Sequence, residues 1–182
     1  MRHPVRMCAV AAASLAAGAL IGYPIAHAAD VTESITVHPA TVGNPLATTI
    51  ALQHLIFEGT LDRFPGLKVL AAHGGGYLGS YAARDDHACF VSPAGCDPTI
   101  KLKKQPSEYL QQLYFDSMVF TPEALRHLVA QVGASQVMLG SDYPYIWELH
   151  PVDPVFATPT LSDEERIGIL GGNAAKLFGM EA

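Results

Sequence analysis

Short apolar runs rich in β-branched residues recur along the chain, separated by longer segments of helical composition. Runs of this length and composition are typical of strands buried inside a parallel sheet. On this basis the sequence predicts four strands, at 35–38, 68–72, 114–119 and 136–140.

The segments between these runs carry apolar residues at helical spacing, and capping residues stand near their starts. Such start signals are Asn44 before Pro45, Thr121 before Pro122, and Ser162 with Glu165 at the reciprocal capping position. Strands that alternate with helices imply a mostly parallel sheet with helices packed on it, and four strands are half of a (β/α)8 barrel. We therefore predict an α/β fold of this kind. The expected helices are 45–64, 77–90, a short one from 106, 121–133, one after Ser162 and a last one capped by Asn173, with loops at 91–106 and 143–160.

The length and composition of the chain exclude several classes of protein. The chain has 182 residues, 49% of them hydrophobic, and a formal net charge of -6. This length fits one domain but falls short of the roughly 200 to 250 residues of a complete barrel. No stripe of lysine and arginine is present to neutralise phosphates, which argues against a nucleic-acid partner. Only one stretch is apolar enough to be considered for a membrane, which excludes a polytopic membrane protein.

The N-terminus has the order of features found in a secretory signal peptide. Arg2 and Arg6 precede an apolar run at 7–22, and small residues at 26 and 28 offer a cleavage site. The run is shorter than the ~20 residues of a spanning helix, so we expect no stable membrane span. We predict a signal peptide at 1–28 and a periplasmic or secreted protein. A retained anchor or a misassigned start codon is the alternative, and without a signal the protein would be cytoplasmic.

The remaining domain, 29–182, keeps two cysteines. Cys89 and Cys96 flank a short loop and would pair in an oxidising compartment. Two free thiols beside the loop are the equal alternative. The spacing does not match a zinc site of the C-x2-C type.

Polar side chains with metal or acid–base chemistry stand where the predicted strands end. His38 ends the first strand, His73 follows the second, Asp116 lies within the third and Asp142 follows the fourth. Ligands collect at the carboxyl ends of parallel strands, and imidazole and carboxylate groups both suit zinc. The pattern predicts a divalent-metal or acid–base site. The alternatives are a surface histidine at 38, a tight glycine turn after His73 and a turn residue at Asp142.

Five motifs occur in a fixed order between residues 35 and 182. In this order they resemble the amidohydrolase-related family of aminocarboxymuconate-semialdehyde decarboxylase and its relatives. The motifs are GNPLATTIA at 43–51, LDRFPGLK at 61–68, AHGGG at 72–76, GSDYP at 140–144 and LGGNA at 170–174.

The resemblance implies the C-terminal half of a metal-dependent TIM barrel, with the N-terminal half missing, that cleaves C–C, C–N or C–O bonds in carboxylated substrates. By motif, His38 and Asp142 resemble metal ligands, usually of zinc, and His73 resembles the catalytic histidine that handles a metal-bound water. Arg84 resembles a contact to the substrate carboxylate, although a solvated helix face with local ion pairs is an equal interpretation of that residue.

One family feature is absent from the sequence: no His-x-His pair, which would supply two further metal ligands, occurs in the chain. Three hypotheses follow. The chain is a carboxy-lyase or hydrolase acting on a small carboxylated substrate, and as half a barrel it would be active as an assembly such as a homo-oligomer. Alternatively, it is a truncated, non-catalytic relative, or it is an exported module that binds a small molecule without chemistry.

Overall fold

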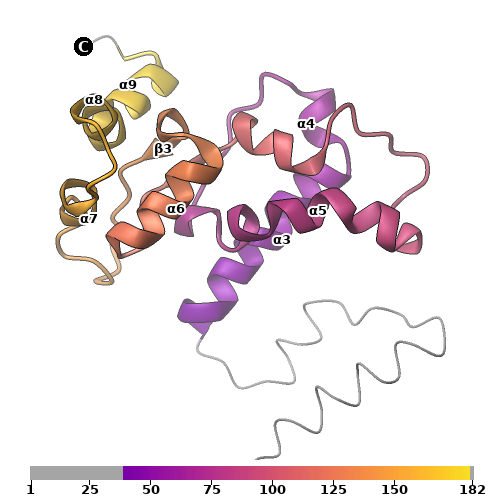
Figure 1. Cartoon of the computed structure of the whole chain (residues 1–182), viewed down its shortest axis with the longest axis horizontal. Coiled ribbons are helices and arrows are strands. Elements are labelled where there is room, and N and C mark those ends of the chain that lie inside the picture. Colours follow the sequence, from indigo (N-terminus) through magenta and orange to yellow (C-terminus); the bar gives the residue numbers. More distant parts are fainter. Residues whose placement is uncertain (1–38, 181–182) are drawn as a thin grey trace, which may run out of the picture. The chain divides into compact units, whose positions relative to one another are not determined.

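A parallel sheet of three strands lies within residues 39–180, which are the residues described by this computed structural model (Figure 1). The strand order is β1-β2-β3. The register pairs Leu70 with Tyr114 and Phe115 with Val137. The α/β class with a parallel sheet is therefore confirmed, while the strand expected at 35–38 lies outside the described residues. The strands are β1 (Leu70–Ala71), β2 (Tyr114–Asp116) and β3 (Val137–Met138).

The strands are shorter than the sequence predicts, and β2 has a local cause for its early end. The Asp116 side chain accepts a hydrogen bond from the backbone N–H of Met118 at 3.1 Å. The N–H of Val119 then turns back to the carbonyl of Ser117 at 2.8 Å. These two bonds replace the ladder with a turn, so the apolar residues after Asp116 are no longer in the sheet.

Most helices begin and end close to their expected positions. The predicted helix 45–64 is divided, because Gly59 adopts a left-handed φ of 68° between two shorter helices. The longer helices are α3 (Asn44–Phe57), α5 (Leu78–Val91) and α6 (Pro122–Val132), and the shorter ones are α4 (Thr60–Arg63), α7 (Asp153–Ala157), α8 (Asp163–Ile167) and α9 (Asn173–Phe178). Short 3-10 segments are His73–Gly75, Pro93–Gly95, Pro106–Gln112 and Ala134–Gln136, and π-type turns are Pro39–Gly43 and Gly168–Gly172.

Two of the four predicted caps are confirmed. The Thr121 side chain accepts from the N–H of Ala124, and Ser162 forms a reciprocal capping box with Glu165. The predicted caps at Asn44 and Asn173 are wrong. Asn44 is already helical, with no capping hydrogen bond from the N-cap at Gly43.

The Asn173 amide does not cap a helix; it ties three parts of the fold together. It lies at the start of α9 and donates hydrogen bonds to the carbonyls of Ala134 and Val137, at 2.8 and 2.7 Å. These long-range bonds leave the side chain unavailable for the local capping role that the sequence suggests.

A short helix interrupts the predicted loop 143–160. Helix α7 forms although Pro151 and Pro159 flank it and Pro154 lies in its first turn. Val155, inside α7, is fully buried in the core, and the buried Thr158 hydroxyl donates to the carbonyl of Pro154 at 2.7 Å. Tertiary burial therefore stabilises a turn of helix that the proline content argues against.

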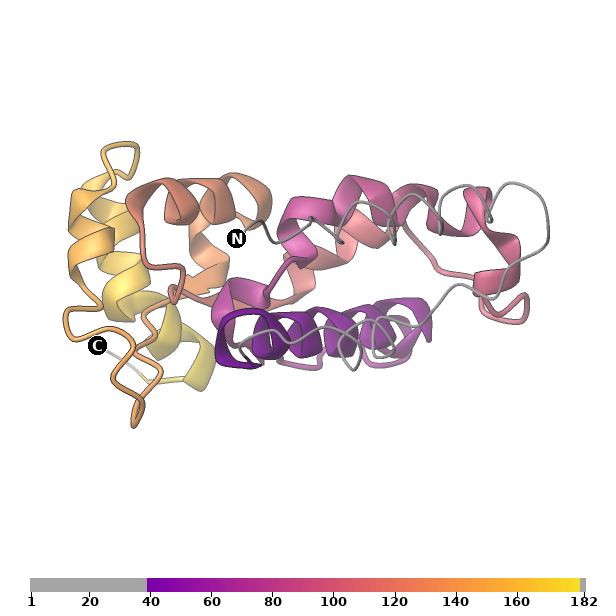
Figure 2. The ribbon, with the colours of Figure 1, turned by 90° about the horizontal axis from the view of Figure 1, so that it is seen from below.

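The core lies between the sheet and the helices that cover it. Phe115 of β2 and Val137 of β3 are fully buried, with Leu125 and Val132 of α6 against them. Helices α3 and α5 are in contact, and α7, α8 and α9 gather beside α6 and β3 (Figure 2). This packing leaves the carboxyl ends of the three strands free to present side chains.

The structure pairs Cys89 with Cys96, which joins the end of α5 to the loop after it. Between residues 39 and 180, no helix combines the length and the hydropathy needed to cross a bilayer. The predicted signal peptide at 1–28 lies outside the described residues.

Candidate active site

A pocket of about 340 Å³ lies at the carboxyl ends of the strands. His73 lies just beyond β1, Phe120 lies beyond β2, and Asp142 lies beyond β3. These are the positions where parallel α/β folds bind ligands. His73 and Asp142, which the sequence analysis singled out separately, therefore line one cavity. The lining residues are Ala40, Thr41, Pro45, His73, Met118, Val119, Phe120, Asp142 and Trp147.

Backbone strain is concentrated at this pocket. Among the described residues, the non-glycine residues with positive φ are His73 at 59°, Phe120 at 66° and Asp142 at 56°, and all three line it. A left-handed backbone disfavours residues with a Cβ, especially a large one such as phenylalanine. Strain of this kind collects at functional sites, where the surrounding fold holds side chains in positions that a relaxed backbone would not give them.

The His73 side chain is held from one side. Its Nδ1 lies 2.9 Å from the Thr48 hydroxyl on α3. The backbone N–H of His73 donates to Oδ2 of Asp116 at 3.1 Å. Between residues 39 and 180 the ring makes no other hydrogen bond, which leaves Nε2 for a ligand. Thr48 belongs to the GNPLATTIA motif, which is the sequence signal that could have identified it.

Asp116 anchors the turn that carries His73. Its carboxylate accepts backbone hydrogen bonds from His73, from Gly74 at 2.7 Å and from Met118. Burial raises the pKa of Asp116, and these backbone donors, together with nearby His73, oppose that rise. Asp116 is thus engaged with the backbone and does not line the pocket.

The three glycines after His73 are required by close packing as well as by conformation. A Cβ on Gly75 would lie 2.6 Å from the Phe115 ring, and a Cβ on Gly76 would collide with the carbonyl oxygen of Pro45. All three have positive φ. The sharp turn expected from the sequence is confirmed, and it also lets β2 and the start of α3 approach the His73 turn.

Asp142 forms a turn, as one interpretation of the sequence expects, and it also lines the pocket; its role as a metal ligand stays a prediction. Its carbonyl accepts from the N–H of Tyr145 at 2.9 Å and so closes a turn, while the residue lines the pocket with His73. Trp147, five residues later, forms another part of the wall. Neither Trp147, in the loop after β3, nor Phe120, between a predicted strand and a predicted helix, carries a sequence signal for this position.

The described residues do not complete a metal site. No group of three or more histidine, cysteine, aspartate or glutamate side chains with metal-binding geometry occurs in the described part of the chain. A catalytic zinc site normally uses three protein ligands. His38, the other predicted ligand, lies outside the described residues, and Asp116 is occupied by backbone donors.

Arg84 lies in a different pocket. It lines a cavity of about 870 Å³ between α3 and α5 that shares no lining residue with the His73 pocket. Contact between Arg84 and a substrate carboxylate therefore stays a prediction.

Comparison with known proteins identifies the family. An amidohydrolase family profile matches residues 11–180. Over 144 residues the chain is 35% identical to 2-amino-3-carboxymuconate-6-semialdehyde decarboxylase from Dictyostelium discoideum, covering 79% of this chain and 40% of that protein.

Solved structures agree with this match. The 5-carboxyvanillate decarboxylase from Sphingomonas paucimobilis is 29% identical with a TM-score of 0.64, over 74% of this chain and 40% of its own. A second 5-carboxyvanillate decarboxylase, from Novosphingobium aromaticivorans, was solved with manganese and 4-hydroxy-3-methoxy-5-nitrobenzoic acid. It is 26% identical with a TM-score of 0.67, and the match covers 75% of this chain and 40% of that one.

The chain thus spans about 40% of the length of each of these three relatives. All three relatives are named as decarboxylases. From its sequence and its fold, the chain belongs to the amidohydrolase family.

Proposed function

We propose that this chain is a metal-dependent carboxy-lyase that decarboxylates a small carboxylated, ring-derived substrate. The observation that carries the proposal is the meeting of His73 and Asp142 in one pocket lined by every described non-glycine residue with positive φ. The relatives named above act as decarboxylases, which favours decarboxylation over hydrolysis.

His73 is the proposed proton donor. In decarboxylation of an aromatic acid, a proton is added to the ring carbon that bears the carboxylate. The C–C bond to the carboxylate then breaks, its electron pair returns to the ring, and CO2 leaves. The Thr48 hydroxyl orients the ring through Nδ1, so that Nε2 is the atom available to deliver the proton.

His38 and Asp142 are the proposed ligands of a divalent ion, and donors beyond the described residues would have to complete the set. The resemblance favours zinc, whereas the relative from Novosphingobium was solved with manganese. We therefore derive no catalytic step from the ion and treat its identity as a result to be measured.

The test uses the full chain, loaded in separate samples with Zn²⁺ or Mn²⁺. CO2 release is measured from 5-carboxyvanillate and 2,6-dihydroxybenzoate labelled in the carboxyl group. We expect release above the protein-free blank, reduced about 100- to 10,000-fold in His73→Ala. His54→Ala is the matched control, because His54 is exposed on α3 and pairs with Glu58. No release with either ion and either acid would overturn the proposal.

Metal content tests the ligand assignment separately. We expect near one equivalent of ion per chain and its loss in Asp142→Asn, while His54→Ala keeps it. An ion retained by Asp142→Asn would remove Asp142 from the ligand set.

A non-catalytic relative is the second candidate function, including a module that binds a small carboxylate without chemistry. It is favoured by the finding that residues 39–180 hold no three-donor group. Protein that stays metal-free in zinc and manganese and releases no CO2, yet binds the same acids, would support this candidate and contradict the first.

Export of the protein is part of the same proposal. Sequencing of the N-terminus of the mature protein from its native cell would find Ala29 first if the signal at 1–28 is cleaved. An intact Met1 in the cytoplasmic fraction would contradict export.

A further inference from the structure

Phe120 lines the His73 pocket from a strained turn between β2 and α6. The backbone N–H of Thr121 donates to the carbonyl of Val119 at 2.9 Å, and Phe120, the residue between them, has a φ of 66°. A hydrogen bond of this kind around a positive φ forms the rare, strained type of γ-turn. Glycine would form the turn without the steric cost that any residue with a Cβ bears there.

The residues on either side of Phe120 hold this turn in place. Met118 is buried, and Val119 packs against the core. Thr121 caps α6, because its hydroxyl accepts a hydrogen bond from the N–H of Ala124 at 3.2 Å. The backbone at Phe120 therefore cannot relax without disturbing the core on one side or the start of α6 on the other.

Stability does not explain a phenylalanine at this position. Phe120 is 49% exposed, so its ring gains only part of the burial energy of a core residue such as Phe115. The steric cost of the positive φ remains. Strain of this kind persists mainly where function uses the strained residue. Phe120 shares its pocket with His73 and Asp142, which makes that pocket the place to look for the use.

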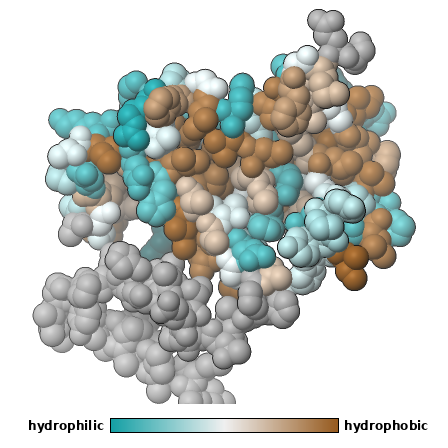
Figure 3. Space-filling model, turned by 180° about the vertical axis from the view of Figure 1, so that it is seen from behind, coloured by the Kyte–Doolittle hydropathy of each residue, from teal (hydrophilic) through white to brown (hydrophobic). Residues whose placement is uncertain are grey.

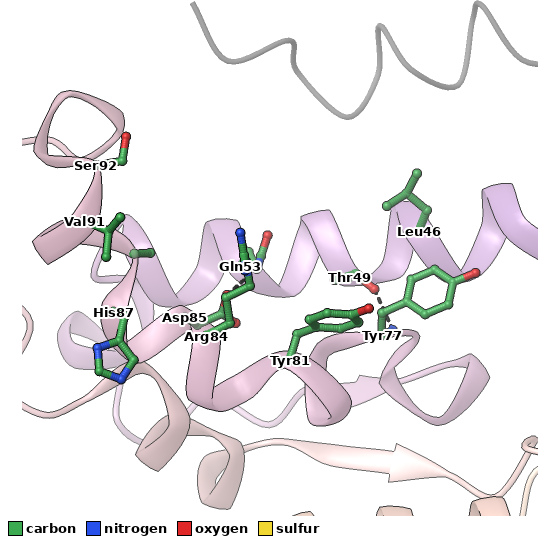
Figure 4. A pocket seen from close by; sticks show the side chains of 11 residues that line it. Leu46, Thr49, Gln53, Tyr77, Tyr81, Arg84, Asp85, His87, Val91 and Ser92 are labelled. Carbon is green, nitrogen blue, oxygen red and sulfur yellow. Dashed lines mark hydrogen bonds between the residues drawn. The ribbon is translucent and has the colours of Figure 1, made fainter. Parts of the chain in front are cut away.

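An aromatic side chain lines the larger cavity, between α3 and α5, without such strain. Figure 4 shows Tyr81 in the wall of that cavity. Tyr81 lies inside helix α5 and is not among the described non-glycine residues with positive φ. Aromatic lining as such therefore needs no left-handed backbone, and the strain at Phe120 belongs to its place beside His73.

We propose that Phe120 determines the specificity of the His73 pocket, where its ring packs against a ligand with one aromatic ring and a carboxylate. This inference deepens the proposed function and rests on its placement of the substrate in this pocket. A pair of aromatic rings attracts beyond the area it buries, and a saturated ring lacks this attraction. The pocket volume of about 340 Å³ is near the lower end of the roughly 300 to 1,000 Å³ of ligand sites, which suits a single ring.

The test compares two acids that differ in aromaticity. Benzoate and cyclohexanecarboxylate share a carboxylate and a ring of six carbons. Their Kd values for the full chain are measured by NMR titration, with and without added Zn²⁺. Any contact of the carboxylate with an ion contributes to both Kd values and cancels in their ratio. We expect benzoate to bind about 2- to 10-fold more tightly than cyclohexanecarboxylate.

Three variants assign this preference to a residue. Phe120→Ala is expected to bring the ratio of the two Kd values to about 1, and Phe120→Tyr, which keeps a ring, is expected to preserve it. Tyr81→Ala is the matched control, because it removes an aromatic side chain from the other cavity. A preference lost in Tyr81→Ala and kept in Phe120→Ala would place the acids in the cavity between α3 and α5 and overturn the proposal.

A fourth variant tests the strain itself. Phe120→Gly and Phe120→Ala both delete the ring, but only glycine accepts the positive φ freely. We expect the same loss of preference in both variants and a Tm about 2 to 4 °C higher for Phe120→Gly. Equal Tm values would show that the turn is not strained, which would remove the reason for assigning Phe120 a function.

The proposal also fails if wild type binds benzoate no more tightly than cyclohexanecarboxylate, or if neither acid binds. These results concern binding alone, so they are separate from the measurement of CO2 release. A chain that prefers benzoate through Phe120 but releases no CO2 would keep the specificity role and lose the decarboxylase assignment. A chain that releases CO2 without this preference would do the reverse.

Discussion

Asp85 is a carboxylate that the fold buries at a cost in stability. Burial is the largest cause that raises its pKa to about 6, from an ordinary value of 3.8, and the neighbouring Asp86 adds to the rise. The hydrogen bond from Gln53 and the charge of Arg84 oppose it. A group with a raised acid pKa binds its proton more tightly in the folded chain, so its contribution to stability is greatest in acid.

The variant Asp85→Asn tests this cost. Below pH 4, Asp85 is protonated in both the folded and the unfolded chain. As the pH rises from about 4 to about 6, the unfolded chain loses this proton first, which favours unfolding. We expect Asp85→Asn to be more stable than wild type at pH 7.5 by up to about 3 kcal/mol, with the difference vanishing near pH 4. Urea unfolding across this pH range measures it, and a difference independent of pH would contradict the prediction.

Asp116 joins two turns, because its carboxylate accepts hydrogen bonds from the backbone N–H groups of His73 and Gly74 and from that of Met118 after β2. In Asp116→Asn, an NH2 group replaces one acceptor oxygen and faces a backbone donor. We expect a loss of about 2 kcal/mol in the free energy of unfolding, measured in urea. Asp153→Asn is the control, since Asp153 is exposed at the start of α7, and equal effects of the two changes would refute the anchoring role.

At the scale of elements, the glycine turn after β1 connects the sheet to two helices. Gly76 has a φ of 64° and would place a Cβ against the Pro45 carbonyl, whereas Gly133, at the end of α6, has a φ of 86° and open space around it. Both positions disfavour alanine by conformation, at about 1 kcal/mol. Only Gly76 adds a collision with backbone.

Gly76→Ala is therefore expected to destabilise the protein by about 3 kcal/mol, and Gly133→Ala by about 1 kcal/mol. Thermal and urea unfolding of the two variants measure the difference. If Gly76→Ala were no worse than Gly133→Ala, the close approach of α3 to this turn would not be required for folding.

The sequence predicted those strands and helix ends that depend on interactions between nearby residues. The apolar runs located β1, β2 and β3, and hydroxyl caps located α6 and α8, because hydrogen bonds within a few residues determine them. Helix α7 and the role of Asn173 depend on burial and on partners 36 to 39 residues away. No window of sequence contains such partners, so these features were missed.

Some residues of the candidate site were likewise predictable from the sequence, and others were not. His73 and Asp142 were found because each follows a strand, and parallel topology brings strand ends together. That Arg84 lines another cavity was not predictable, since this depends on how α3 and α5 pack against each other, which the local sequence does not determine. The positive φ of Phe120 carries no sequence signal, because phenylalanine is a residue that rarely adopts it.

For the molecule as a whole, the described part holds a three-stranded sheet, and the match covers about 40% of the length of the relatives. A sheet of this size leaves apolar side chains uncovered. Figure 3 shows a broad apolar patch across one face of the described residues. Beside the His73 pocket, the segment 143–149 exposes several large apolar side chains: Tyr143, Tyr145, Ile146, Trp147 and Leu149.

Exposed apolar surface of this kind marks a contact with another chain or a further segment. Ile146 is 86% exposed, so a lysine there removes apolar surface without disturbing the core. We expect the purified chain to show a concentration-dependent mass above the 19.4 kDa monomer in light scattering, and Ile146→Lys to shift it toward the monomer. Thr160→Lys adds the same charge at an exposed polar position and is expected to leave the mass unchanged. A wild-type mass that stays monomeric at all concentrations would mean that the exposed segment 143–149 does not drive self-association, and the homo-oligomer expected for half a barrel would lose its support from this surface.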